Sequence, residues 1–235
     1  MSRRPIPWLL EVLVPLADIV MGVNETRSSY LLAAGVAVEL LSEERTATAW
    51  DRPSVLEGMS VGVLAAHLAR SVLQVGWFLD GEVLGNSTPV PASTYYARLT
   101  DTTSPSSALN QGVETRSAET AAKGAALTSA ETREALALLR QRFAIEGDDR
   151  RVAVAHRPGE ELLLDEYLAT RLVELSVHIE DLSLSVGSTA EAPLAAVTRA
   201  VDVLVAAARE RHGDRAVLHA LSRRERDERS ALRVL

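Results

Sequence analysis

The stretch from Glu166 to Gly187, EYLATRLVELSVHIEDLSLSVG, constrains the fold of this chain more than any other. At about 100° per residue, a helix places its polar side chains on one stripe with apolar residues on both flanks. The stripe consists of Tyr167, Arg171, Glu174, His178, Asp181 and Ser185. An ordinary amphipathic helix turns such a stripe to solvent, whereas these flanks predict that it points into the protein. We expect the opposite face, with Ala169, Ser176 and Ser183, to tolerate water.

Glu174 and His178 lie at the centre of this stripe. Because they are four residues apart, a helix places their side chains one above the other on the same face. A buried carboxylate and a buried imidazole need partners, since burying unpaired polar groups is costly. A divalent metal ion is one partner that suits both.

A second helix is predicted from Val61 to about Leu84, with Ser60 as its N-cap. His67, near its middle, shares a polar stripe that is again bracketed by apolar positions, so we expect it to face inward. A lone Glu–His pair at this spacing is usually solvated, but a second inward histidine raises the case for a metal site. Two histidines and one carboxylate leave a coordination position open, which is typical of catalytic rather than structural sites.

The other polar residues have simpler interpretations. Asp181, one turn after His178, is expected to orient that histidine or to form a salt bridge rather than to bind metal itself. Arg171 has two interpretations, pairing with a carboxylate substrate or an ion pair with Glu174 or Asp181, and we favour the ion pair. The remaining histidines are interpreted as surface residues: His156, His212 and His219.

Composition favours one all-α domain. The chain has 235 residues, of which 47% are hydrophobic, so it can bury a sizeable core. Aromatic residues make up only 4%, and the abundant Ala, Leu, Arg and Glu favour helices over strands. The net charge of -7 gives no reason to expect nucleic acid or an acidic membrane as a partner. The absence of cysteine excludes disulfides, thiolate metal sites and a cysteine nucleophile.

The order of the remaining elements follows from periodicity and turn residues. Gly85 to Ser106 has loop composition, with one short helical turn at Tyr95 to Leu99. A small β-hairpin from Arg151 to Leu164 leads to Asp165, the expected N-cap of the helix with the polar stripe. Further helices are predicted over Asn24 to Thr48, Ser107 to Ala144, Leu194 to Arg211 and Ala216 to Leu235.

Residues 1–23 are fairly apolar, but they do not match a membrane span or a signal peptide. Glu11, Pro15 and Asp18 interrupt the run, which falls short of the bilayer thickness, and no small-residue cleavage motif follows. We therefore expect a cytoplasmic protein that does not associate with membranes. This segment is an N-terminal extension, or a leader that precedes a true start at Met21.

Two segments carry a family resemblance. The first is Trp50 to Ala69, WDRPSVLEGMSVGVLAAHLA, and the second is Arg171 to Leu182, RLVELSVHIEDL. In order and separation they resemble the two signatures of the mycothiol-dependent maleylpyruvate isomerase N-terminal family, within the DinB-like superfamily. The resemblance covers about residues 24–187 and implies a DinB-like four-helix bundle. Residues 188–235 are then a C-terminal helical extension with extra helices.

The resemblance also implies a site. It implies a divalent metal, usually zinc (Zn2+) with Ni2+ or Fe2+ as alternatives, held by His67, Glu174 and His178. A low-molecular-weight thiol such as mycothiol would dock at the open position, where its thiolate attacks a small-molecule electrophile. Fewer than 50 residues follow Gly187. This is too short for the second domain that contributes to the isomerase active site, so maleylpyruvate isomerisation itself is not expected.

Three hypotheses remain open. The first, which we prefer, is a metal- and thiol-dependent enzyme of transferase or isomerase type. The second is a metal-binding bundle without turnover that acts as a sensor or interaction module. The third is an inert bundle in which the triad is a hydrogen-bond network. Because DinB-like bundles often dimerise, the resemblance also allows a homodimer.

Overall fold

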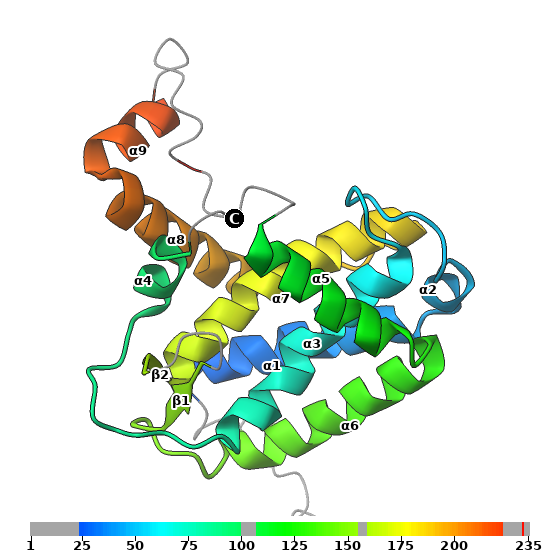
Figure 1. Ribbon diagram of the computed structural model, residues 1–235, viewed down its shortest axis with the longest axis horizontal. Coiled ribbons are helices and arrows are strands. Elements are labelled where there is room, and N and C mark those ends of the chain that lie inside the picture. Colours follow the sequence, from blue (N-terminus) through cyan, green and yellow to red (C-terminus); the bar gives the residue numbers. More distant parts are fainter. Residues whose placement is uncertain (1–23, 100–106, 155–158, 223–231, 233–235) are drawn as a thin grey trace, which may run out of the picture.

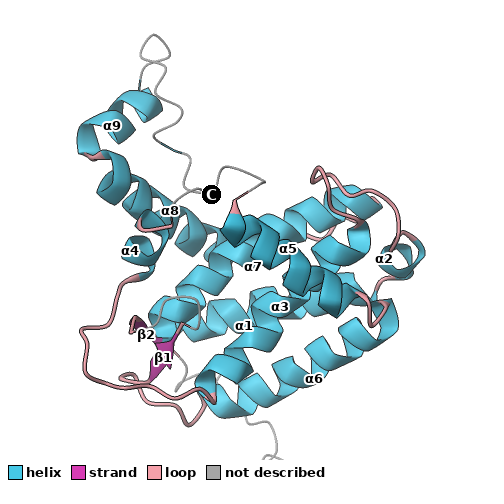
Figure 2. Cartoon of the chain, in the orientation of Figure 1, coloured by secondary structure: helices cyan, strands magenta, loops and turns pink. Residues whose placement is uncertain are grey.

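A computed structural model of the chain describes residues 24–99, 107–154, 159–222 and 232. Within these ranges the chain forms helices and one small antiparallel sheet (Figures 1 and 2), so the predicted all-α fold with a β-hairpin is confirmed. The elements in order are α1 (Glu25–Ser42), α2 (Glu44–Thr48), α3 (Val61–Leu79), α4 (Ala92–Ala97), α5 (Ala108–Ala121), α6 (Ala125–Phe143), β1 (Arg151–Ala153), β2 (Glu161–Leu163), α7 (Leu164–Val186), α8 (Leu194–His212) and α9 (Asp214–Ser222).

Four long helices, α1, α3, α6 and α7, form the bundle. The α1 helix packs on α6 and α7, and α3 packs on α6 and α7 from the other side. Apolar residues three or four positions apart line the shared core, which is the helical pattern expected for buried faces. Leu64 and Leu68 of α3 and Leu172 and Leu175 of α7 are fully buried. Burial of each such leucine is worth about 1.5–3 kcal/mol relative to exposure.

The helix predicted over residues 24–48 is two helices. The α1 helix ends at Ser42, Glu43 is extended with φ -64° and ψ 137°, and α2 then begins. Side-chain hydroxyl groups compete here with backbone N–H groups for the carbonyl oxygens at the end of α1. The Thr46 side chain donates to the carbonyl oxygen of Leu40 at 2.8 Å, and such local bonds offer the chain an alternative to helix.

The long helix predicted over residues 107–144 is also two helices. Its start is capped as the composition suggests, because the Ser107 hydroxyl accepts from the N–H of Asn110 at 3.1 Å. The chain turns at Gly124, whose φ of 83° lies in the left-handed region that glycine tolerates best. This turn separates α5 from α6 and lets both pack on α3. The single predicted helix was therefore wrong at this glycine.

The α3 helix begins as predicted and ends earlier. The Ser60 hydroxyl accepts from the N–H of Val63 at 3.2 Å, and the helix stops at Leu79 rather than near Leu84. By length and composition α3 is the one helix among the described residues that passes the test for a membrane span. However, 61% of this apolar stretch is buried in the structure, as in a core helix of a soluble bundle.

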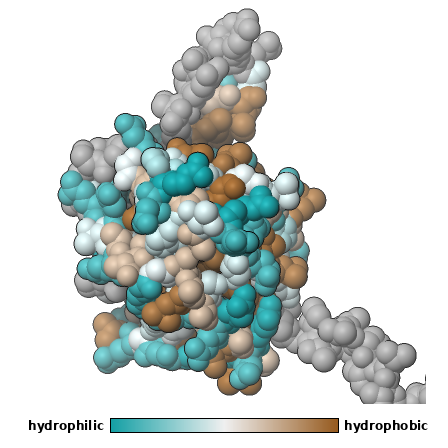
Figure 3. Space-filling view, turned by 90° about the vertical axis from the view of Figure 1, so that its right-hand side faces the viewer, coloured by the Kyte–Doolittle hydropathy of each residue, from teal (hydrophilic) through white to brown (hydrophobic). Residues whose placement is uncertain are grey.

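The molecular surface carries no single type of side chain on the face that Figure 3 shows, where hydrophilic and hydrophobic side chains are mixed.

The α7 helix starts two residues earlier than predicted. Leu163 precedes it, so Asp165 lies in the first turn and is not the N-cap. Its carboxylate instead accepts from Nε of Arg27 at 2.8 Å and from the side-chain amide of Asn24 at 2.6 Å. The preceding hairpin pairs β1 with β2 in antiparallel register. His156 lies outside the described residues.

The face of α7 opposite the polar stripe is mostly buried, which corrects our expectation, and only Ser176 on it keeps intermediate exposure. Ala169 is fully buried and Ser183 is 5% exposed, because α1 and α8 pack on this helix. The exposed positions of α7 are instead Val177, Glu180 and Leu184. Periodicity located the polar stripe, but it did not show that a C-terminal helix would cover the other side.

The C-terminal helices lie at one end of the bundle. The α8 helix matches the helix predicted over residues 194–211, and α4 lies beside it (Figure 1). The α9 helix covers only Asp214–Ser222 of the predicted tail helix, whose remainder falls mainly outside the described residues. The expectations for residues 1–23 also lie outside them.

Candidate metal centre

The packing of α3 on α7 brings together His67, Glu174 and His178. Oε2 of Glu174 lies 3.4 Å from Nε2 of His67 and 3.5 Å from Nε2 of His178. One donor atom from each side chain lies within 4.8 Å of the other two. The two imidazole rings meet edge to face, with centroids 4.5 Å apart. The three residues selected from the sequence therefore form one cluster.

The spacing of these atoms suits a shared ion. An N–H···O hydrogen bond typically spans about 2.7–3.2 Å, which is shorter than both separations here. Donors bound tetrahedrally to zinc at about 2.0–2.1 Å stand about 3.3–3.4 Å apart. The measured 3.4 and 3.5 Å match such an edge more closely than a hydrogen bond. The geometry therefore fits a metal ion better than a hydrogen-bond network within the triad.

The far edges of both imidazoles have partners that set their tautomers. Nδ1 of His178 lies 3.0 Å from Oδ2 of Asp181, and a carboxylate only accepts, so Nδ1 carries the hydrogen. Nδ1 of His67 lies 3.4 Å from the Ser117 hydroxyl, which donates its own hydrogen to the carbonyl oxygen of Val113. In the neutral form of each imidazole, Nε2 is thus the nitrogen with the lone pair, the arrangement that metal-binding histidines use.

Tyr96 is a site residue that sequence reasoning missed. It is fully buried on α4, and its hydroxyl lies 2.9 Å from Oε1 of Glu174 and 3.0 Å from the carbonyl oxygen of Thr170. Burial and the nearby Glu174 carboxylate raise the pKa of Tyr96 well above its ordinary value, so it stays a neutral donor. Only the short turn at residues 95–99 was visible in the sequence, and no periodicity linked it to α7.

The protonation states of the triad determine what a cation would meet there. Burial lowers the pKa of His67, so this imidazole is neutral near pH 7. Burial opposes charge on His178 too, but Asp181 and Glu174 raise its pKa to about 9. Burial alone would raise the pKa of Glu174, yet the two imidazoles and Arg171 hold it well below the usual range. A metal ion bound here would be held by the Glu174 carboxylate, and His178 would first have to give up a proton.

The triad is not sealed from solvent. The side chains of His67, Glu174 and His178 keep 18%, 17% and 16% of their exposure. Each of the three side chains is therefore partly buried.

A family model described as the mycothiol maleylpyruvate isomerase N-terminal domain matches residues 31–183. The chain belongs to this family. The match contains α3, all but the last three residues of α7 and all three donor residues, so the resemblance in the two signature segments is confirmed. Searches of curated proteins and of solved structures returned no match.

Arg171 in this maleylpyruvate isomerase family domain does not behave as we favoured from the sequence. Its Nε donates to the Thr170 hydroxyl at 3.1 Å, and its guanidinium carbon lies 5.3 Å from the ring centroid of Tyr167. Among the described residues, no carboxylate pairs with it within 4.0 Å, so the expected ion pair with Glu174 or Asp181 is not formed. The hydroxyl of Tyr167 is also buried without a hydrogen-bond partner in the described structure.

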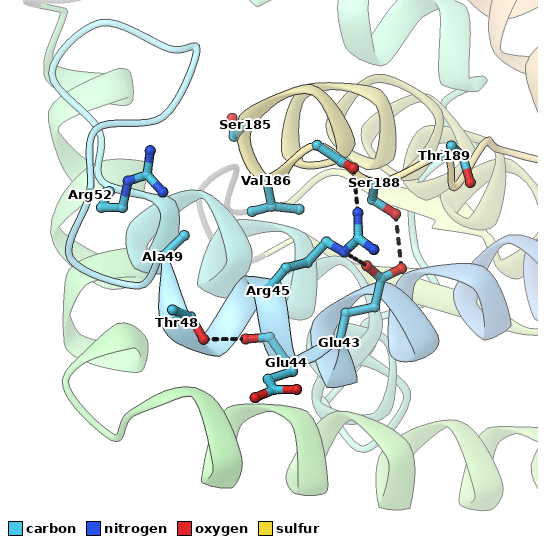
Figure 4. Close-up of a pocket in the computed structure, with 11 residues that line it drawn as sticks. Glu43, Glu44, Arg45, Thr48, Ala49, Arg52, Ser185, Val186, Ser188 and Thr189 are labelled. Carbon is cyan, nitrogen blue, oxygen red and sulfur yellow. Dashed lines mark hydrogen bonds and ion pairs between the residues drawn. The ribbon is translucent and has the colours of Figure 1, made fainter.

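A separate surface pocket of about 890 Å³ lies between α2 and the C-terminal end of α7 (Figure 4). Figure 4 shows Arg45 pairing with Glu43, at 2.9 Å, while Ser188 donates to the same carboxylate at 2.8 Å. These charges satisfy one another, and the pocket contains no residue of the triad. The pocket is therefore separate from the candidate metal centre.

Proposed function

We propose that this chain is a metal- and thiol-dependent enzyme of transferase or isomerase type. The observation that supports it is the convergence of His67, Glu174 and His178 with both Nε2 atoms turned to one carboxylate oxygen. Zinc suits two imidazoles and a carboxylate, and Ni2+ and Fe2+ accept the same donors. Mycothiol or a similar thiol is the proposed cosubstrate, since the family description contains that thiol.

In the proposed reaction, the metal ion and the residues around the triad would have different roles. When bound, the ion would supply Lewis acidity that lowers the pKa of a neighbouring thiol. Tyr96 and Asp181 would hold Glu174 and His178 in position through their hydrogen bonds. Arg171, which has no carboxylate partner among the described residues, would bind an anionic or polar group of the thiol or of the electrophile.

The bond changes of the proposed reaction are those of thiol addition or substitution. The thiol proton passes to the solvent, and the sulfur forms a bond to an electrophilic carbon. In substitution, the displaced electron pair departs with the leaving group. In addition to a double bond, it moves to the adjacent carbon, which either takes a proton from the solvent or, in an isomerisation, expels the thiolate again after the bond has rotated. We further propose a cytoplasmic location and small-molecule partners, because the net charge of -7 does not favour nucleic acid or acidic lipid.

A second candidate function is a metal-binding bundle without turnover. It is supported by the groups that contact the triad, since Tyr96, Ser117 and Asp181 all orient ligands. Neither candidate needs a second domain. Turnover of electrophiles with a thiol, present in the metal-loaded protein and absent after chelation, would separate them.

Elemental analysis tests the proposed site. The wild type is expected to carry about one metal ion per chain, and Glu174→Ala, His67→Ala and His178→Ala to lose it while circular dichroism stays helical. His212→Ala is the matched control, because this histidine is exposed on α8 and should not affect the metal content. Full metal retention in all three triad variants would overturn the proposal.

A further inference from the structure

The short helix α4 is held at its C-terminal end by one arginine of α8. The guanidinium of Arg211 donates to the carbonyl oxygens of Tyr96, Ala97 and Leu99, with distances of 3.2 Å to Ala97 and 2.6 Å to Leu99. The last carbonyls of a helix lack partners within the helix. Arg211 donates to two of them, Tyr96 and Ala97, and to Leu99 just after the helix.

The N-terminal half of α4 is tied down as well. The N–H of Ala92 donates to Oε2 of Glu166 at 2.7 Å, and Arg199 of α8 lies 3.4 Å from the other oxygen of that carboxylate. The Thr94 hydroxyl donates to Glu210 of α8 at 2.9 Å. A helix of six residues is not stable alone, so these contacts with α7 and α8 determine where α4 lies.

This placement reaches the triad through Tyr96. Its carbonyl oxygen accepts from Arg211, and its hydroxyl lies 2.9 Å from Oε1 of Glu174. With Oε1 engaged, Oε2 is the oxygen that faces His67 and His178. One residue thus joins the C-terminal helix to the carboxylate at the centre of the site.

We propose that Arg211 is a positioning residue of the metal centre, which holds α4 so that Tyr96 orients the Glu174 carboxylate toward the two histidines. The inference rests on the proposed metal site. It also gives α8 a role in that site, although α8 lies outside the family match at residues 31–183. Partners that orient metal ligands typically change metal affinity by about 10- to 100-fold.

Co2+ titration of the full chain tests this proposal. Bound Co2+ absorbs visible light in a way that reports the ligand arrangement, and binding is measured well below the melting temperature of every variant. Arg211→Ala and Tyr96→Phe are each expected to weaken Co2+ binding by about 10- to 100-fold and to change the Co2+ spectrum alike. Arg211→Lys keeps the positive charge but loses the planar guanidinium with its several donors, so it should bind Co2+ more tightly than Arg211→Ala and less tightly than the wild type.

A variant that combines Arg211→Ala with Tyr96→Phe tests whether Arg211 affects the metal centre through Tyr96. If Arg211 works through Tyr96, the double variant binds Co2+ no more weakly than the weaker single variant. The proposal would be overturned if the losses of Co2+ affinity in the two single variants multiplied in the double variant. It would also be overturned if Arg211→Ala kept the affinity and the Co2+ spectrum of the wild type. Should Arg211→Ala fail to fold, Arg211→Lys enters the same cycle.

Arg209→Ala is the matched control. Arg209 lies two residues earlier on α8 and pairs at 2.7 Å with exposed Asp214, far along the chain from α4, so Co2+ binding should not change. A wild type that binds no Co2+ would instead overturn the metal site itself, an outcome distinct from failure of the Arg211 variants alone.

Discussion

His178 and Asp181 lie one turn apart on α7, and Nδ1 of the histidine is 3.0 Å from Oδ2 of the aspartate. This contact orients the ring, places the hydrogen on Nδ1 and leaves Nε2 facing Glu174 at 3.5 Å. The corresponding contact of His67 is with Ser117, at 3.4 Å, and involves a neutral hydroxyl. Because hydrogen bonds to charged acceptors are stronger and 3.4 Å is long, the two histidines are supported unequally.

This inequality predicts an order of effects on metal binding. Asp181→Ala is expected to weaken Zn2+ affinity by about 10- to 100-fold, and Ser117→Ala by less. Competition titration against a chromophoric chelator measures both constants. Glu180→Ala is the control, since this neighbouring carboxylate is exposed on α7. Equal affinities for the Asp181 variant and the control would contradict the role given to Asp181.

Two glycines of α3 predict opposite effects of the same substitution. A Cβ at Gly62 would stand 2.7 Å from the Trp50 ring, whereas a Cβ at Gly76 meets nothing within 4 Å. Gly62→Ala must displace that ring and should destabilise the fold by about 1–3 kcal/mol. Gly76→Ala should stabilise it by up to about 1 kcal/mol, the helix propensity gain. Urea unfolding of both variants checks the signs, and matching signs would refute the packing argument.

Buried Arg27 predicts a large loss of stability. It is 2% exposed, pairs with Asp165 at 2.8 Å, and donates to the carbonyl oxygens of Glu146 and Gly147 at 2.7 and 2.9 Å. Arg27→Met leaves these acceptors without their donor and should cost about 3–5 kcal/mol in the free energy of unfolding. Arg140→Met, at an exposed position of α6, should change it little. If Arg27→Met lowered the free energy of unfolding as little as Arg140→Met does, the hydrogen bonds and ion pair of Arg27 would not contribute to stability.

Part of this architecture follows from local sequence signals. Apolar residues three or four positions apart flank the polar stripe of α7, and this pattern predicted that Glu174 and His178 face inward. The N-cap residue Ser60 predicted where α3 begins. These signals depend only on neighbours along the chain, so helical periodicity reveals them.

The missed features depend on contacts between distant segments. Tyr96 reaches Glu174 because Arg211, more than 100 residues later, holds α4 in place. Ala169 is buried because α8 covers that side of α7. The break before Gly124 had a local signal in the glycine, but only packing of α6 on α3 makes the turn necessary.

Removal of the metal should lower stability without unfolding the bundle. Buried leucines such as Leu64 and Leu172 form a core that does not consist of metal ligands. A ligand that binds only the folded state adds about 4 kcal/mol at 1,000 times its dissociation constant. Chelation should therefore lower the melting temperature while far-ultraviolet circular dichroism at 25 °C is unchanged. Glu174→Ala should melt at one temperature with or without metal, and a wild type that does the same would contradict the prediction.

Glu161 predicts a pH dependence of stability that is independent of the metal. Its Oε1 accepts from the N–H groups of Gly85 and Leu84 at 2.9 and 2.6 Å, and Arg151 lies 3.1 Å from Oε2. The Gly85 N–H is the largest contributor that lowers the pKa of this carboxyl, followed by Arg151 and the Leu84 N–H, against the opposing effect of burial.

Because this pKa is lower in the folded than in the unfolded chain, the stabilisation is complete above the unfolded value of about 4.5. It is lost as pH falls through the folded value. Glu161→Gln should cost about 1–3 kcal/mol at pH 7, and its difference from the wild type should shrink as the pH is lowered from 5 toward about 3. Urea unfolding across this range measures the difference. Exposed Glu82→Gln should show no such trend, and a difference for Glu161→Gln that stays constant with pH would refute the assignment.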